Sequence, residues 1–104
     1  MDIEIRREDR GDRGRYHLVV DGSEAGELDY RVIEGRRAFV HTGVRDAYEG
    51  QGLAAQLAER VLRDARADGV SIIPLCPYVQ GYLEHHEEHA DLVDHDAWQR
   101  LRSR

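Results

Sequence analysis

Residues 49–54 combine the residue types and the spacing of a phosphate-binding loop. They read Glu49, Gly50, Gln51, Gly52, Leu53 and Ala54, between an apolar strand pattern and a long helical pattern. A helix N-terminus carries unpaired N–H groups and a positive dipole end, so it binds phosphate without a basic side chain. No Gly-Lys-Ser/Thr and no second βαβ unit follow, which excludes a Walker loop and a dinucleotide fingerprint. A plain structural turn is the alternative interpretation.

Cys76 is the only cysteine, and it lies between Pro74 and Pro77, where a predicted strand gives way to a predicted helix. A thiol at a helix N-terminus feels the positive end of the helix dipole, which favours the nucleophilic thiolate. Such a thiolate could accept an acyl group and pass it on. The alternative is a buried and inert cysteine.

His41 lies on a predicted strand, with the same parity as Phe39 and Gly43. Its imidazole could act as a base, either directly or through a water molecule. A strand histidine held by structural hydrogen bonds is the alternative interpretation.

His85, Glu88 and His89 form the pattern His-x-x-Glu-His, which on one helix is typical of a zinc peptidase. A catalytic zinc ion also needs a third protein ligand and a substrate cleft, and such peptidases are far larger than this chain. We therefore interpret the pattern as a solvated helix face and predict no metal site. A metal-dependent hydrolase is the weakest of the functions considered.

The composition restricts compartment and partners. The chain has 104 residues and a formal net charge of −6, and all 15 basic residues are arginines. Without a basic run, nucleic acid is not expected as a partner. The longest uncharged stretch, residues 69–83, is too short to span a bilayer. Because there is one cysteine and no apolar segment of a signal peptide, we expect a soluble cytoplasmic protein with a single domain over residues 1–104.

Apolar residues at alternate positions predict strands in the first half of the chain, at residues 3–5, 16–20, 25–32 and 38–44. The turns between them are short, which favours antiparallel pairing. The charged stretch at residues 6–15 is predicted to be a solvated loop.

The second half of the chain has helical periodicity. An apolar residue at every fourth position from Leu53 predicts an amphipathic helix that ends at Gly69. We then predict a buried strand at residues 70–75, a helix at 77–89, an edge strand at 91–94 and a helix at 96–104. This order predicts an α/β fold with a mostly antiparallel, twisted sheet and flanking helices.

Four segments, in this order, resemble a family of small, single-domain N-acetyltransferases of the GNAT type. They are residues 21–28 (Asp-Gly-x-x-Ala-Gly-Glu-Leu), His41-Thr42, the loop at 49–54, and residues 74–93, which include Pro-Leu-Cys-Pro-Tyr-Val, Tyr82 and Ala-Asp-Leu-Val. The Cys-Pro-Tyr-Val segment together with the glycine loop is the most specific part of the resemblance.

The resemblance implies a GNAT-like fold with acetyl-CoA as cosubstrate. The backbone of residues 49–54 would hold the pyrophosphate, and the pantetheine arm would run beside the strand that ends at Val44. The thioester would lie where the strands at 38–44 and 70–75 splay apart, near Cys76. Tyr82 would protonate the departing CoA thiolate.

The implied function is the transfer of an acetyl group to an amine, directly or through Cys76. Gly43 stands where the family has a glutamate, so this chain lacks one candidate carboxylate base. A CoA-binding module without catalysis is therefore the alternative. The acceptor amine and the oligomeric state are not indicated, although a net negative charge by itself favours a basic amine or a basic peptide.

Overall fold

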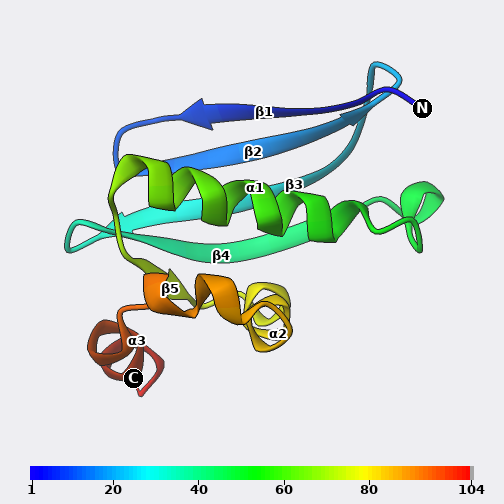
Figure 1. Cartoon of the computed structure of the whole chain (residues 1–104). Helices are drawn as coiled ribbons and strands as arrows, with labels where there is room; N and C mark the ends of the chain where they lie inside the picture. The colour runs from blue at the N-terminus through cyan, green and yellow to red at the C-terminus, as the bar shows by residue number, and fades with distance from the viewer. Residues whose placement is uncertain (104) are drawn as a thin grey trace.

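The computed structural model describes residues 1–103 as a five-stranded sheet with flanking helices (Figure 1). Four strands pair in antiparallel order along the chain: β1 (Ile3–Asp9), β2 (Arg13–Val20), β3 (Ser23–Ile33) and β4 (Arg36–Val44). The last strand, β5 (Ile72–Pro74), pairs with β4 in parallel. The predicted α/β fold with a mostly antiparallel sheet is confirmed.

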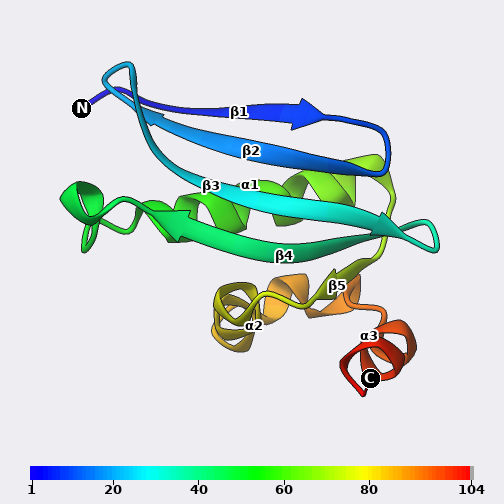
Figure 2. The same ribbon diagram turned by 180° about the vertical axis from the view of Figure 1, so that it is seen from behind.

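Three α-helices cover the sheet. α1 (Leu53–Asp68) crosses one face and α2 (Pro77–Glu84) packs beside it, whereas α3 (His95–Arg102) lies near β5 (Figures 1 and 2). Two short 3-10 helices lie in the connections, η1 (Asp46–Tyr48) between β4 and α1, and η2 (Glu87–Leu92) between α2 and α3. Among residues 1–103, no helix is both long and apolar enough to cross a membrane.

The apolar stripe of α1 builds the main core. Leu57, Val61 and Leu62 are completely buried in one cluster with Tyr16 and Phe39 of the sheet. A second, smaller cluster on the opposite face joins α3 to the end of the sheet through Ala38, Ile73 and Ala97. The two clusters lie on opposite faces because neighbouring strand residues point in opposite directions.

The charged stretch at residues 6–15 is not the solvated loop that the sequence predicted. β1 and β2 extend into it from both ends and form a hairpin. Arg7 faces the helix side and pairs with Asp68 of α1 at 2.9 Å, while on the other face Arg10 donates to Glu8 at 2.6 Å. Because charged side chains find partners on both faces, the strands continue without apolar residues.

The predicted helix at residues 77–89 is also wrong in its length, because α2 ends at Glu84. The N–H groups of His85 and His86 donate three residues back along the chain, which tightens the helix into 3-10 geometry and leads into η2. The predicted edge strand at residues 91–94 is reduced to a single bridge between Val93 and Ile72.

Two further predicted elements, the strand at residues 70–75 and the helix at residues 96–104, differ from the structure at their ends. The strand predicted at residues 70–75 is confined to β5. α3 begins one residue earlier than predicted, because the Asp94 side chain accepts the Ala97 N–H at 3.0 Å and caps the helix. Arg104, to which the prediction extended this helix, lies outside the described residues.

Leu57→Ala tests the α1 core. The side chain is completely buried, so its loss leaves a cavity and should lower the free energy of unfolding by about 2–5 kcal/mol. Urea denaturation measures this change. Gln56→Ala, at an exposed position of the same helix, is the control and should change stability by less than about 0.5 kcal/mol. Equal effects of the two substitutions would contradict this description of the core.

Candidate functional site

A gap opens in the sheet where β4 and β5 separate. The two strands are paired for three residues, and the last pair is Phe39 with Pro74. The Cys76 N–H still donates to the Phe39 carbonyl at 2.8 Å. Beyond this point β4 continues to Val44, whereas the segment after β5 turns away into α2. The gap therefore lies between the second half of β4 and the start of α2.

A β-bulge in β4 determines which side chains border the gap. Asp29 pairs with His41 and Tyr30 pairs with Phe39, so Val40 is an extra residue without a partner on β3. Val40 packs in the α3 cluster, and His41 follows it on the same face of the sheet. The sheet face that carries α1 is the inner face here, and the opposite face is the outer face.

A hollow of about 340 Å³ lies on the inner side, beside the N-terminus of α1. It is lined by residues of β4, η1, the glycine loop and α2: Thr42, Val44, Tyr48, Glu49, Gly50, Gly52, Leu53, Ala54 and Tyr78. Of the residues that the sequence assigned to cofactor binding, only Gln51 does not line it. The sequence analysis gave no site role to Thr42, Tyr48 or Tyr78, which reach the hollow from separate elements, although Thr42 and Tyr78 belong to the segments that resemble the family.

The first turn of α1 has backbone N–H groups that no side chain caps. Its N-cap, Gly52, has left-handed backbone angles (φ 73°), and no acidic residue stands in the first turn. Gly50 is also left-handed (φ 78°), which explains both glycines, since other residues adopt this conformation at a cost. An uncapped helix N-terminus on a hollow can bind a phosphate group.

Cys76 is the N-cap residue of α2 and lies at the closed end of the gap. Its sulfur is 3.3 Å from the Thr42 hydroxyl oxygen, and Thr42 lines the hollow. The residue is only 3% exposed. The structure thus places the predicted thiol next to the hollow but covers it from solvent.

His41 forms a cluster with Glu27 and Arg45 on the outer face. Nε2 of His41 is 3.0 Å from Glu27 Oε2, and Arg45 Nη1 donates to Glu27 Oε1 at 2.7 Å. The Glu27 carboxylate is buried, whereas half of the His41 side chain is exposed. Burial alone would raise the pKa of Glu27, but hydrogen bonds from Arg45 and His41 lower it below its usual value. An exposed imidazole oriented by a buried carboxylate can accept a proton.

Gly43 makes room for this carboxylate. A Cβ atom at position 43 would lie 2.6 Å from Glu27 Oε2, which is too close for a real contact. Glu27 pairs directly with Gly43 across β3 and β4. The sequence did not indicate Glu27, because the strand register that brings it to His41 is not visible in the residues alone.

Tyr82 is not brought to the hollow. Its hydroxyl donates to Glu59 of α1 at 2.5 Å, and its ring stacks on His86. Burial and the Glu59 carboxylate raise the pKa of Tyr82. Tyr78 lies one helical turn earlier and lines the hollow, with 40% of its surface exposed.

The predicted His-x-x-Glu-His pattern is not presented on one helix, because α2 ends before His85. Glu88 and His89 instead approach Glu59, with one ligand atom of each within 4.8 Å of the others. His89 Nε2 is already 2.9 Å from a Glu59 oxygen. His85 lies outside this group, so the helical basis for a zinc peptidase is absent within residues 1–103.

The sequence profile of the GCN5-related N-acetyl-transferase family matches residues 15–92 of the chain. Among curated proteins, none is significantly similar to it in sequence. The matched region includes β3, β4, the glycine loop, α1, β5 and α2, and therefore every residue that lines the hollow.

Solved structures of N-acetyltransferases share the fold. Ribosomal-protein-alanine N-acetyltransferase from Brucella melitensis is 23% identical, with a TM-score of 0.57 over 74% of this chain and 62% of that chain. The ribosomal-protein-S18-alanine N-acetyltransferase from Escherichia coli is 17% identical, with a TM-score of 0.62 over 74% and 53%. This chain thus spans less than two thirds of either protein.

A GCN5-like protein from Staphylococcus aureus has a size similar to that of this chain. It is 25% identical, with a TM-score of 0.66, and the match covers 86% of both chains. The sheet and helices described above therefore also occur in a small protein, without the additional length of the two enzymes.

Glu27→Gln tests the outer-face cluster. The folded-state pKa of Glu27 lies below its ordinary value of 4.5, so the ionised carboxylate stabilises the fold above that pH, and this contribution is lost as the pH falls through the folded value. We expect the variant to lose about 1–3 kcal/mol at pH 7, and the difference from wild type to shrink at about pH 3. Urea denaturation at both pH values measures it.

Glu4→Gln, at an exposed position on β1, is the control for this comparison, and it should lie close to wild type at both pH values. A Glu27→Gln effect that does not depend on pH would show that the charge of Glu27 does not stabilise the fold.

Proposed function

Since the chain belongs to the GCN5-related N-acetyltransferase family, we propose that it binds acetyl-CoA and transfers the acetyl group to an amine. The observation that carries this proposal is the hollow, because an uncapped helix N-terminus opens there toward the gap between β4 and β5. The backbone N–H groups of the α1 first turn would bind the pyrophosphate. The free edge of β4 up to Val44 would pair with the amide groups of the pantetheine arm.

Direct transfer needs a base for the amine and an acid for the leaving thiolate. We assign the base to His41, which Glu27 orients, because the imidazole is exposed on the outer side of the gap. We assign the acid to Tyr78 rather than Tyr82, because the Tyr78 hydroxyl belongs to a residue that lines the hollow. The amine nitrogen then bonds to the acetyl carbon, its proton passes to His41, and CoA leaves as the thiol.

Transfer through Cys76 is the second route. Its thiolate would displace CoA from the thioester and form an S-acetyl group, which the amine would then attack. The contact between Cys76 and Thr42 supports this route, since Thr42 lines the hollow. The free thiol also agrees with a reducing compartment, and we propose the cytoplasm as the location.

A CoA-binding module without catalysis is the other candidate function. The burial of Cys76 favours it, as does the hydrogen bond that keeps Tyr82 on Glu59. The two functions differ in turnover: the enzyme releases CoA steadily when an acceptor amine is supplied, and the module binds CoA without consuming acetyl-CoA.

Ala54→Glu tests the phosphate-binding role of the α1 N-terminus. A carboxylate in the first turn favours the helix but repels a bound pyrophosphate. We expect unchanged or slightly higher stability and a CoA dissociation constant at least about tenfold above that of Ala54→Gln, which has the same shape without the charge. Calorimetric titration with CoA measures both variants. Equal affinities for CoA would contradict binding at this helix end.

Intact-mass spectrometry after mixing the protein with acetyl-CoA tests the route through Cys76. The chain contains no lysine, so Cys76 and the N-terminal amine are the expected self-acetylation sites. If Cys76 carries the acetyl group, denatured protein gains one acetyl mass, and Cys76→Ala does not. Turnover of an amine by Cys76→Ala at the wild-type rate would exclude this route and leave direct transfer.

A further inference from the structure

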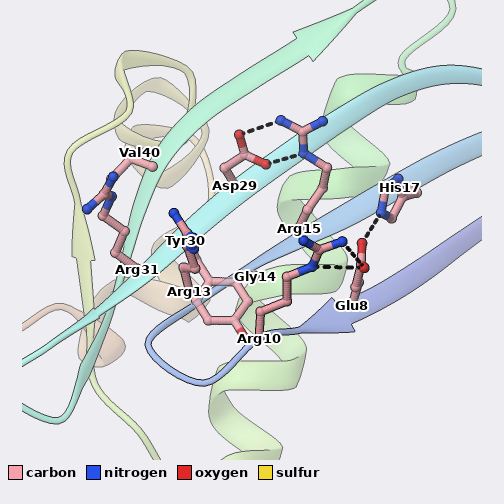
Figure 3. A pocket seen from close by; sticks show the side chains of 10 residues that line it. All are labelled: Glu8, Arg10, Arg13, Gly14, Arg15, His17, Asp29, Tyr30, Arg31 and Val40. Atoms are coloured by element: carbon pink, nitrogen blue, oxygen red, sulfur yellow. Dashed lines mark hydrogen bonds and ion pairs between the residues drawn. The ribbon is translucent and has the colours of Figure 1, made fainter.

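A second hollow, of about 400 Å³, lies on the outer face of the sheet (Figure 3). Four of the residues that line it are arginines, Arg10, Arg13, Arg15 and Arg31. Two carboxylates, Glu8 and Asp29, also line it, which leaves an excess of two positive charges. The local charge is therefore opposite to the net charge of the chain, −6.

The pairing within this hollow leaves two of the arginines without partners. Arg10 donates to Glu8, and Arg15 donates to both oxygens of Asp29, at 2.6 and 3.0 Å. Figure 3 draws these bonds, and no dashed line reaches Arg13 or Arg31. Neither guanidinium has a hydrogen bond or ion pair with any other residue in the described part of the chain.

Arg13 and Arg31 face each other across β2 and β3 in register. Like charges directly opposite each other in a sheet are unfavourable, and an anion between them removes that repulsion. Guanidinium groups bind carboxylate and phosphate oxygens in a bidentate manner, so the pair is suited to an oxyanion.

This hollow lies on the same face as His41. Val40, which lines the hollow, directly precedes His41, and Asp29 pairs with His41 across β3 and β4. Arg31 lies on β3, two residues beyond Asp29, which is the partner of His41. Arg13 lies opposite Arg31 on β2, one strand farther from His41. With strand spacings of about 4.8 Å and a rise of about 3.3 Å per residue, the backbone distances are roughly 8 and 12 Å.

We propose that the acceptor is a small amine with a carboxylate or phosphate group roughly 8–12 Å from its nitrogen. Arg13 and Arg31 bind the oxyanion, and the amine is thereby placed beside His41 at the gap. The inference rests on the proposed acetyl transfer and names its acceptor class. The amine nitrogen bonds to the acetyl carbon and its proton passes to His41, while the C–S bond of the thioester breaks and the CoA sulfur takes a proton from Tyr78.

Glycine peptides and their C-terminal amides test the proposal. The span from amine to carboxylate grows by about 3.5 Å per residue, so triglycine matches the expected distance better than diglycine or tetraglycine. With the wild-type protein and acetyl-CoA, we expect kcat/KM for triglycine to exceed that of its amide by roughly tenfold or more. In the double variant Arg13→Gln/Arg31→Gln this ratio should fall to about one.

The control is Arg6→Gln/Arg63→Gln, which removes the same charge from exposed positions outside this hollow and should keep the wild-type ratio. A wild-type protein that acetylates acids and amides equally, or a double variant that keeps the preference, would overturn the proposal. Phosphate monoesters of amino alcohols, with the same distance from the nitrogen to the anionic group as triglycine, are tested as acceptors beside it. The larger kcat/KM shows whether the site prefers a phosphate or a carboxylate.

A binding measurement separates this inference from the proposed function. Side-chain Nε–H signals of Arg13 and Arg31 are followed by NMR during titration with triglycine, its amide and inorganic phosphate. Shifts with triglycine and phosphate but not with the amide support an oxyanion site even if no acetyl transfer occurs. If neither anion shifts these signals, the arginines are only solvated surface charges and the proposal fails. It also fails if ultracentrifugation shows a wild-type dimer and a monomeric double variant, because the arginines then mediate self-association.

Discussion

β4 and β5 share three residue pairs and then part, and the position of this short ladder determines where the gap in the sheet opens. Ile72 and Ile73 anchor it from opposite faces, one in the α1 core and the other in the α3 cluster. Beyond the ladder, the edge of β4 is free for an extended ligand. The N-terminus of α1, the Cys76 thiol and the His41 imidazole are all arranged around this opening. If β5 were longer, it would close the gap and separate the inner hollow from the outer face.

Arginine pairing, rather than apolar contact, holds the charged part of the sheet in place. Arg7 and Arg37 both reach Asp68 near the end of α1, at 2.9 and 3.0 Å, and Arg37 also lies over the Tyr30 ring. A planar guanidinium can do both, whereas a lysine ammonium cannot stack in the same way. This use agrees with a composition in which every basic residue is arginine. Arg37 is buried and Arg7 is partly buried, so removing Asp68 would leave both charges poorly solvated and without this partner.

Features with a local chemical signal could be predicted from the sequence, and features that depend on register could not. The stripe of α1, the glycine loop and the position of Cys76 each follow from a few neighbouring residues. Glu27 and His41 are 14 positions apart, and the bulge at Val40 determines that they meet. The hairpin at residues 6–15 was missed because its strands are filled with charges, whose partners within the hairpin, on β3 and on α1 are set by the fold. The proposed choice of Tyr78 over Tyr82 depends on position along α2, because residues four apart share one helix face and Tyr78 lines the hollow whereas Tyr82 contacts Glu59.

Gly43 and Glu27 share one volume, and this sharing constrains how the sequence can evolve. A side chain at position 43 collides with the Glu27 carboxylate as it stands, because the added Cβ atom would lie 2.6 Å from Glu27 Oε2. A residue other than glycine at position 43 therefore requires either a smaller residue at position 27 or a Glu27 carboxylate that gives up its bonds to His41 and Arg45. The two positions should therefore covary among relatives. In either case His41 loses its Glu27 partner, and Asp29, which pairs with His41 on β3, is then the carboxylate residue next to it.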